Sequence, residues 1–226
     1  MRDFSPIHMV QRMKNIHWPD QVLNFLGVIL GVLLAFYISS AAEDRKENKE
    51  LDNILLSFQS ELENDYREYS ESQIPFHEAQ AESIGKLLES LHASDADEEQ
   101  LSVVFEATNY SPQNTTYLSV VSSGKLGLID DLELRKNISR YYDVLSSEAI
   151  ETGEAQIDFF MHEIIPWMIE NTDLMDVETE DIADDTAFAN RLLLYQSLIQ
   201  TKTEQYQEIS NSAHQLIKQI KAYQDS

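Results

Sequence analysis

Histidine and carboxylate side chains are the groups from which this chain could build a metal site, so their spacing is informative. His162 and Glu163 are adjacent, as in the HExxH zinc motif, but the second histidine that this motif needs one helical turn later is missing. His77, His92 and His214 are isolated from one another in sequence. We therefore expect these four histidines to be ordinary surface or capping residues, and we predict no metal ligand among them.

Two acidic stretches offer the oxygen ligands that calcium prefers, but neither has the order of a calcium loop. The linker 173–185 lacks the central glycine and the regular spacing of an EF-hand. We expect this linker to be a solvated loop, and the shorter run 95–99 to compensate the charge of a helix N-terminus. The acidic residues are Asp173, Asp176, Glu178, Glu180, Asp181, Asp184 and Asp185 in the linker and Asp95, Asp97, Glu98 and Glu99 in the shorter run.

Nucleophilic catalysis has no recognisable basis in the sequence. The chain contains no cysteine, which removes disulfides, thiolate metal sites and cysteine nucleophiles. It has no GxSxG elbow, glycine-rich phosphate loop or kinase signature, and Ser122–Ser123–Gly124 is more typical of a helix end than of a nucleophile turn. We therefore predict no catalytic residue and no cofactor, and a metal-dependent membrane-bound hydrolase is the least favoured function.

The element that must position everything else is the uncharged run 21–42, QVLNFLGVILGVLLAFYISSAA. A helix of about 20 residues crosses the hydrocarbon core of a bilayer, which is about 30 Å thick. The run exceeds the apolar part of a cleavable signal peptide, although the small residues 39–42 leave cleavage open as an alternative. We expect an uncleaved signal anchor, a single transmembrane helix at 21–42.

Small residues recur every fourth position within this run, at Gly27, Gly31, Ala35 and Ser39. They share one helix face, and small residues let the backbones of membrane helices approach closely. Such residues are also simply common in membrane helices. We predict that this face contacts a partner helix, from a second copy of the chain or from another envelope protein.

The segment 1–20 is expected in the cytoplasm or at the membrane interface. Ile7, Val10 and Met13 have helical spacing, so an interfacial helix and an unstructured tail both fit. Positive charges, which favour the cytoplasmic side, flank the span almost equally on its two sides. We place the N-terminus inside and the domain 43–226 in the periplasm, because that domain has few basic residues to resist export. The predicted location is the bacterial inner membrane.

The domain 43–226 is strongly acidic, with 13 Lys and Arg against 38 Asp and Glu. Nucleic-acid binding depends on basic side chains that displace counterions from phosphates, so this composition argues against it. Anionic lipid headgroups repel the domain for the same reason. We expect no nucleic-acid partner.

Apolar residues recur at helical spacing throughout 43–226 and predict an all-α fold, since no long stretch has the two-residue period of a strand. Seams occupy 51–69, 84–91 and 134–168. The clearest seam alternates steps of four and three, and ten of its eleven positions are apolar. Those positions are Phe188, Leu192, Tyr195, Ile199, Lys202, Tyr206, Ile209, Ala213, Leu216, Ile220 and Tyr223. We predict that the transmembrane helix continues into an antiparallel up-and-down helical bundle with a coiled-coil seam.

Several breaks between these helices are predicted. A second helix should start near Pro75, a short helix should form at 101–107, and 109–114 should be a loop. A helix at 117–123 should end at Gly124 in a left-handed cap, with Gly127 and Asp130–Asp131 starting the next helix. Within 132–168 the apolar phase slips near Gly153, and Pro166 should kink or restart the helix.

The stretch 115–142, TTYLSVVSSGKLGLIDDLELRKNISRYY, resembles a family of bacterial single-pass membrane proteins of unknown function. The pattern that carries the resemblance falls on Tyr117, Ser123, Gly124, Lys125, Leu126 and Ile129. A short N-terminus, one apolar span, a charged run after it and a helical C-terminus complete the likeness. The resemblance implies a single-pass envelope protein and carries no known activity. We interpret the motif itself as a structural helix-to-helix corner rather than a binding motif.

Two functions of different kinds remain for such a chain. The favoured one is a membrane-anchored helical scaffold or accessory subunit that binds other envelope proteins or itself. The alternative is a helical bundle that senses a ligand and signals through a partner membrane protein, because the segment 1–20 is too short to contain an output domain.

Overall fold

The computed structural model describes residues 18–93, 106–172 and 185–225. Every regular element among these residues is a helix and none is a strand, so the all-α prediction is confirmed for the described part of the chain. The chain divides into two compact units, residues 1–50 and residues 51–226. The apolar pattern of each unit explains its helices.

The first unit contains the N-terminal part of α1 (Trp18–Arg67). The part of α1 that follows residue 22 contains an 18-residue window with a mean hydropathy of 2.2, and no residue of this window is buried. Apolar side chains such as Phe25, Leu30 and Phe36 are exposed along it. By length and composition, α1 is the one helix among the described residues that could cross a membrane.

The second unit begins with a helical path that does not turn back at Pro75. The α-helix α1 passes into the π-helix η3 (Glu68–Gln73) and then into α2 (Ile74–Ala93). A proline has no N–H and its ring clashes with the carbonyl four residues earlier. Here the N–H of Ile74 binds the carbonyl of Tyr69, five residues back, so a wider π turn precedes Pro75. The predicted helix start near Pro75 is therefore confirmed, since α2 begins at Ile74, although the seams 51–69 and 84–91 belong to one path.

The same device recurs in the long path α5 (Leu132–Arg140), η5 (Tyr141–Leu145), α6 (Ser146–Phe159), η6 (Phe160–Ile164) and α7 (Ile165–Asn171). The predicted restart at Pro166 is confirmed, since Pro166 lies in the first turn of α7 after the π-helix η6. The predicted slip at Gly153 was wrong, because α6 runs through Gly153 without interruption. The phase changes instead at the two π-helices, where each turn takes an extra residue.

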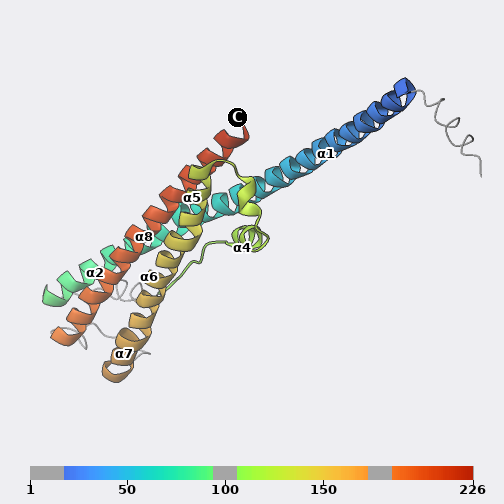
Figure 1. Ribbon diagram of the computed structural model, residues 1–226. Coiled ribbons are helices and arrows are strands. Elements are labelled where there is room, and N and C mark those ends of the chain that lie inside the picture. The colour runs from blue at the N-terminus through green and yellow to red at the C-terminus, as the bar shows by residue number, and fades with distance from the viewer. Residues whose placement is uncertain (1–17, 94–105, 173–184, 226) are drawn as a thin grey trace, which may run out of the picture. The chain divides into compact units, whose positions relative to one another are not determined.

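The final helix α8 (Thr186–Gln224) packs along both paths, as Figure 1 shows for α2 and α6. Its predicted seam is confirmed, because all ten of its positions from Phe188 to Ile220 are buried and the eleventh, Tyr223, is half-buried. Lys221 of α8 contacts Glu63 of α1, and Gln196 of α8 contacts Ala81 of α2. Residue numbers therefore increase along the α1–α2 path in the direction in which they decrease along α8. These two elements therefore run in opposite directions.

A segment without regular secondary structure, residues 106–114, crosses the second unit, and we call it the strap. The predicted loop 109–114 is confirmed by it. Of the predicted short helix 101–107, residues 101–105 lie outside the described part, and Glu106 and Ala107 are not helical. After the strap come α4 (Thr115–Ser122) and the 3-10 helix η4 (Lys125–Leu128).

The buried apolar side chains of the second unit form two clusters. The first cluster consists of Leu55, Phe58, Leu62, Tyr69, Tyr117, Val120, Ile129, Leu134, Ile138, Tyr141, Tyr142, Leu145, Ala149, Tyr206, Ile209, Ala213, Leu216, Ile217 and Ile220. The second cluster consists of Ile84, Leu87, Leu91, Phe160, Ile164, Trp167, Met168, Phe188, Leu192, Tyr195 and Ile199. Helix α8 contributes to both clusters along its single seam.

Candidate functional site

The strap is the part of the second unit where buried polar chemistry concentrates. A non-helical segment has N–H and C=O groups without helical partners, and such groups must be satisfied when they are buried. Side chains from α1, α2 and α8 supply those partners here. We therefore take the strap and the polar side chains beneath it as the candidate site.

Asp65 anchors the C-terminal part of the strap. Its Oδ1 accepts hydrogen bonds from the Tyr110 hydroxyl at 2.7 Å and from the Gln113 N–H at 3.1 Å, and its Oδ2 accepts one from the Tyr141 hydroxyl at 2.9 Å. Asp65 is fully buried, and this burial raises the pKa of its carboxyl, although the three donors act to lower it. The carboxylate thus joins the strap to α5–η5 through α1.

Glu61, one turn earlier on α1, repeats the arrangement at the start of α4. Its Oε1 accepts hydrogen bonds from both the N–H and the hydroxyl of Thr116, at 3.0 and 2.8 Å. Residues four apart lie on the same helix face, so one face of α1 binds both the end of the strap, through Asp65, and the start of α4, through Glu61.

Lys202 holds the N-terminal part of the strap from α8. Its Nζ donates to the Thr108 carbonyl at 2.5 Å and to Gln156 Oε1 at 2.8 Å, and lies 5.3 Å from the centre of the Tyr206 ring. Lys202 is fully buried, and this lowers the pKa of its ammonium group to about 8. Gln156 in turn donates to the Tyr195 hydroxyl at 2.8 Å. A buried ammonium group is thus satisfied by a carbonyl and an amide.

Tyr206, one turn after Lys202, binds the middle of the strap. Its hydroxyl donates to Asn109 Oδ1 at 2.9 Å and accepts from the Tyr110 N–H at 3.4 Å. Asn109 passes so close to α6 that a Cβ on Gly153 would lie 2.1 Å from its Oδ1. The absence of a side chain at Gly153 therefore leaves space for Asn109 of the strap, and the helix α6 has no phase slip there.

His77 contradicts the expectation that each histidine is a surface or capping residue. It is fully buried on α2, with its Nδ1 3.4 Å from Gln80 Oε1, and its Nε2 has no hydrogen-bond partner among the described residues. Burial, with a smaller effect of the nearby Lys202, lowers the pKa of His77 to about 4. The expectation failed because His77 lies one turn after buried Gln73, on the face that α8 and the strap cover.

The other histidines agree better with the expectation. His162 is exposed and pairs with Asp158 one turn earlier at 3.0 Å, whereas His214 is half-buried and stacks on Tyr66. The side chain of His92 lies outside the described part. Among the described residues no group of three or more His, Asp or Glu side chains could hold a metal ion.

The six residues of the Tyr117 motif lie around α4 and η4. The Tyr117 hydroxyl donates to Asp143 at 2.5 Å, and its ring stacks on Tyr142 with centres 4.7 Å apart. Gly124 has a φ of 71°, which confirms the predicted left-handed cap. Ser123, Lys125, Leu126 and Ile129 surround that turn; the Ser123 hydroxyl binds the Ser119 carbonyl, Leu126 is half-buried against the first cluster, and Ile129 is fully buried.

The small-residue face of α1 stays a prediction. Gly27, Gly31, Ala35 and Ser39 are exposed within the first unit, and a Cβ added at either glycine would meet no atom within 4 Å. Of the acidic runs, 95–99 and 173–184 lie outside the described residues.

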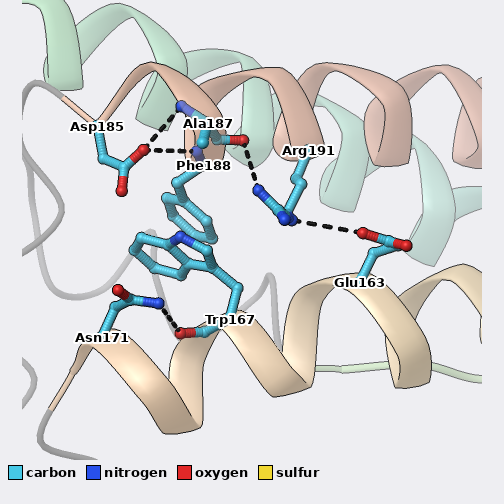
Figure 2. Close-up of polar contacts among 7 residues, drawn as sticks. All are labelled: Glu163, Trp167, Asn171, Asp185, Ala187, Phe188 and Arg191. Atoms are coloured by element: carbon cyan, nitrogen blue, oxygen red, sulfur yellow. Dashed lines mark hydrogen bonds and ion pairs between the residues drawn. The ribbon is translucent and has the colours of Figure 1, made fainter.

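A second polar group lies where α7 meets the start of α8 (Figure 2). Asp185, the last residue of the acidic linker, caps α8 by accepting from the N–H groups of Ala187 and Phe188 at 2.7 and 3.0 Å. Behind this cap the rings of Trp167 and Phe188 stack with centres 3.9 Å apart. Arg191 joins the carbonyl of Ala187 to Glu163, at 3.1 and 3.5 Å (Figure 2). These contacts fasten the helix start and offer no reactive group.

Surface hollows in the second unit are shallow features of the helix surfaces. One, of about 500 Å³, lies between α2 and α8 and is lined by Glu78, Glu82, Gly85, Gln196 and Glu204 among others. The amide of Gln196 crosses it to the Ala81 carbonyl at 2.7 Å. Gln207 also crosses between the two helices and donates to Glu78 at 3.1 Å, so both of these amides are already bonded.

The sequence contained one signal for the buried site. Lys202 and Asp65 are charged residues in phase with apolar seams, and a buried charge needs hydrogen-bond partners.

No family model, no curated protein and no solved structure matches the chain. The resemblance to a single-pass membrane family therefore stays a prediction.

Proposed function

We propose that this chain is a single-pass membrane protein whose acidic helical domain acts by binding other envelope proteins or a second copy, as a scaffold or accessory subunit. The observation that carries the proposal is the fully exposed apolar window of α1, with a mean hydropathy of 2.2, within a helix that also supplies core residues to the second unit. Water disfavours such a surface, and a bilayer accommodates it.

The proposed orientation places the N-terminus in the cytoplasm and residues 43–226 in the periplasm of a bacterium, as an antiparallel up-and-down bundle. The opposite direction of α8 and the α1–α2 path supports the bundle. The low number of basic residues supports export. A phosphatase fused at Ser226 that is active only in the periplasm should be active; an inactive but intact fusion contradicts this orientation.

Membrane insertion is tested by alkaline washing of envelopes that contain the full chain. We expect the protein to stay in the pellet, and the double substitution Leu30→Arg and Leu34→Arg to release it, because arginine is costly at the centre of a bilayer. Leu193→Arg with Leu194→Arg is the matched control, since these leucines are similarly exposed but lie on α8. Release of the unsubstituted chain would remove the basis of the proposal.

The partner is tested in the membrane itself. Gly27→Leu with Gly31→Leu should abolish self-association in a two-hybrid assay, because leucine side chains hold the helix backbones apart. Val28→Leu with Val32→Leu is the control, because these positions lie on a different face of the same helix. Cross-linking in mild detergent then identifies a partner other than the chain itself. A protein that is monomeric and without partners in both assays contradicts the proposal.

A further inference from the structure

The strap is fastened to the helices almost entirely by side chains, and this distinguishes it from every helix around it. Lys202 binds the Thr108 carbonyl, Gln80 binds the Glu106 carbonyl, and Asp65 binds the Gln113 N–H. A helix keeps its own backbone hydrogen bonds when a neighbour is lost. The strap has no such reserve, so its position depends on the state of these side chains.

His77 lies at the point where two of these fastenings meet. Gln80 is shared, because its Oε1 faces His77 Nδ1 while its Nε2 donates to the strap at Glu106. The His77 ring also packs against the Tyr206 ring, with centres 5.7 Å apart, and Tyr206 binds both Asn109 and the Tyr110 N–H. A change at His77 therefore reaches the strap at residues 106, 109 and 110.

The groups that surround His77 offer little to a positive charge. Helix α8 contributes the ammonium group of Lys202 and the phenol of Tyr206, and η3 contributes Tyr69 to the same ring cluster. The strap contributes Tyr110, which packs against Tyr69, and α2 itself contributes the Phe76 ring and the amide of Gln80. The carboxylate of the cluster, Asp65, is occupied by Tyr110, Tyr141 and Gln113. Lys202 is the charged residue that acts on His77, and it repels an imidazolium.

We propose that protonation of His77 releases the strap, so that mild acid opens residues 106–114 while the helices stay folded. The imidazolium must either remain beside the Lys202 ammonium group or reach water, and water becomes accessible when the strap lifts. This pH response is independent of the proposed role as a scaffold or accessory subunit. If the domain lies outside the cytoplasmic membrane, it is also exposed to the pH of the surroundings.

The size of the effect follows from the two states of His77. When the strap is closed, the pKa of His77 is about 4. When the strap is open and His77 is solvated, its pKa should be that of an ordinary histidine, about 6.5. Acidification from pH 7 to pH 5 then raises the opening equilibrium by about 20-fold. Asp65 opposes this change at lower pH, because burial raises the pKa of its carboxyl and protonated Asp65 favours the closed strap.

Amide hydrogen exchange of the full chain in detergent tests the proposal. At pH 7 and pH 5, after correction for intrinsic rates, the Tyr110 and Gln113 amides should show an opening equilibrium that rises by about 20-fold. The Ile209 and Ala213 amides of α8 should change by less than about twofold, because they lie in the helix core. Equal changes at both places mean global unfolding and overturn the proposal, as does no change at the strap.

Two histidine variants separate His77 from the general effect of acid. His77→Gln keeps a polar side chain that does not titrate and should abolish the response at Tyr110 and Gln113. His162→Gln, at an exposed histidine, should keep it. If His77→Gln does not fold, the ring signals of His77 in the unsubstituted chain decide: titration far below 6.5 agrees with the proposal, and titration near 6.5 overturns it.

Discussion

The two clusters of the second unit are filled in different ways although one helix, α8, runs through both. The first cluster contains five buried tyrosines, Tyr69, Tyr117, Tyr141, Tyr142 and Tyr206. The second cluster contains one, Tyr195, and is otherwise built from aliphatic side chains, Phe160 and the Trp167–Phe188 stack. Tyrosine combines a large apolar ring with a hydroxyl that needs a partner. The first cluster is therefore the polar one.

The strap accounts for this difference. Tyr110 of the strap packs against the first cluster and brings with it backbone groups that have no helical partner, whereas the second cluster receives only the small side chain of Ala107. A buried polar group is costly unless it is bonded, so the helices that face the strap carry Asp65 and Tyr206, which bind Tyr110, and Lys202, which binds Thr108. We conclude that the second cluster is stabilised mainly by apolar packing, whereas the first combines apolar packing with the hydrogen bonds that Asp65 and Tyr206 make to the strap.

The largest expected effect belongs to the second cluster. Phe188→Ala should lower the free energy of unfolding by about 4 kcal/mol, because it removes a fully buried ring and leaves a cavity against Trp167. Urea unfolding of the full chain in detergent, followed by circular dichroism, measures it. Leu194→Ala, at a side chain 57% exposed, should change stability by less than about 0.5 kcal/mol. Equal losses would contradict the role of packing here.

In the first cluster, loss of a hydrogen-bond acceptor should matter more than loss of volume. Asp65→Ala should cost about 3 kcal/mol in the same assay, since two phenols and one amide N–H lose their acceptor inside the protein. Asp65→Asn keeps the shape and one oxygen and should recover more than half of that loss. An asparagine variant as unstable as the alanine variant would show that the charge itself is required.

The free energy of unfolding should depend on pH through Lys202, which holds the strap and belongs to neither apolar cluster. Its pKa is about 8 in the folded chain and about 10.5 when unfolded, so the unfolded state holds more protons between these values. Stability should therefore increase by about 2 kcal/mol from pH 8 to pH 10, as the cost of the buried charge disappears. Lys202→Met should remove this increase, whereas Lys218→Met, at an exposed lysine of the same helix, should retain it.

The smallest expected effect should be the same for both clusters. Asp131 caps α5 by accepting from the N–H groups of Glu133 and Leu134, and Asp185 caps α8 in the same way. Replacement of either by alanine should cost about 1 kcal/mol, because a lost cap frees only local helix N–H groups. Thermal unfolding in detergent compares the two variants. A much larger loss at one of them would mean that its cap also supports the cluster behind it.

The sequence predicted the parts of the fold that repeat or that depend on one residue. The α8 seam from Phe188 to Ile220 was correct because each of its positions follows from its helical spacing. The cap at Gly124 was correct because a positive φ favours glycine. The helix start near Pro75 was correct, but the sequence alone did not reveal that a π turn joins α1 and α2 into one helical path.

The candidate site was largely missed, and the reason lies in distance along the chain. Lys202 was noticed only as an exception in the seam, and His77 was expected to be a surface or capping residue. Their partners lie far away in sequence: Lys202 binds residues 46 and 94 positions distant, and Asp65 binds residues 45 to 76 positions distant. Helical periodicity relates residues three and four apart and carries no information on such pairs.

The sequence by itself determined that the chain is helical, that its N-terminal helix has an apolar surface long enough for a bilayer, and which face of α8 is buried. Side-chain size and hydropathy at fixed helical spacing suffice for these properties. Only the tertiary structure decided that the strap enters the core and that Asp65, Lys202 and His77 meet it there. Each of these contacts depends on the relative register of packed helices, which local sequence does not specify.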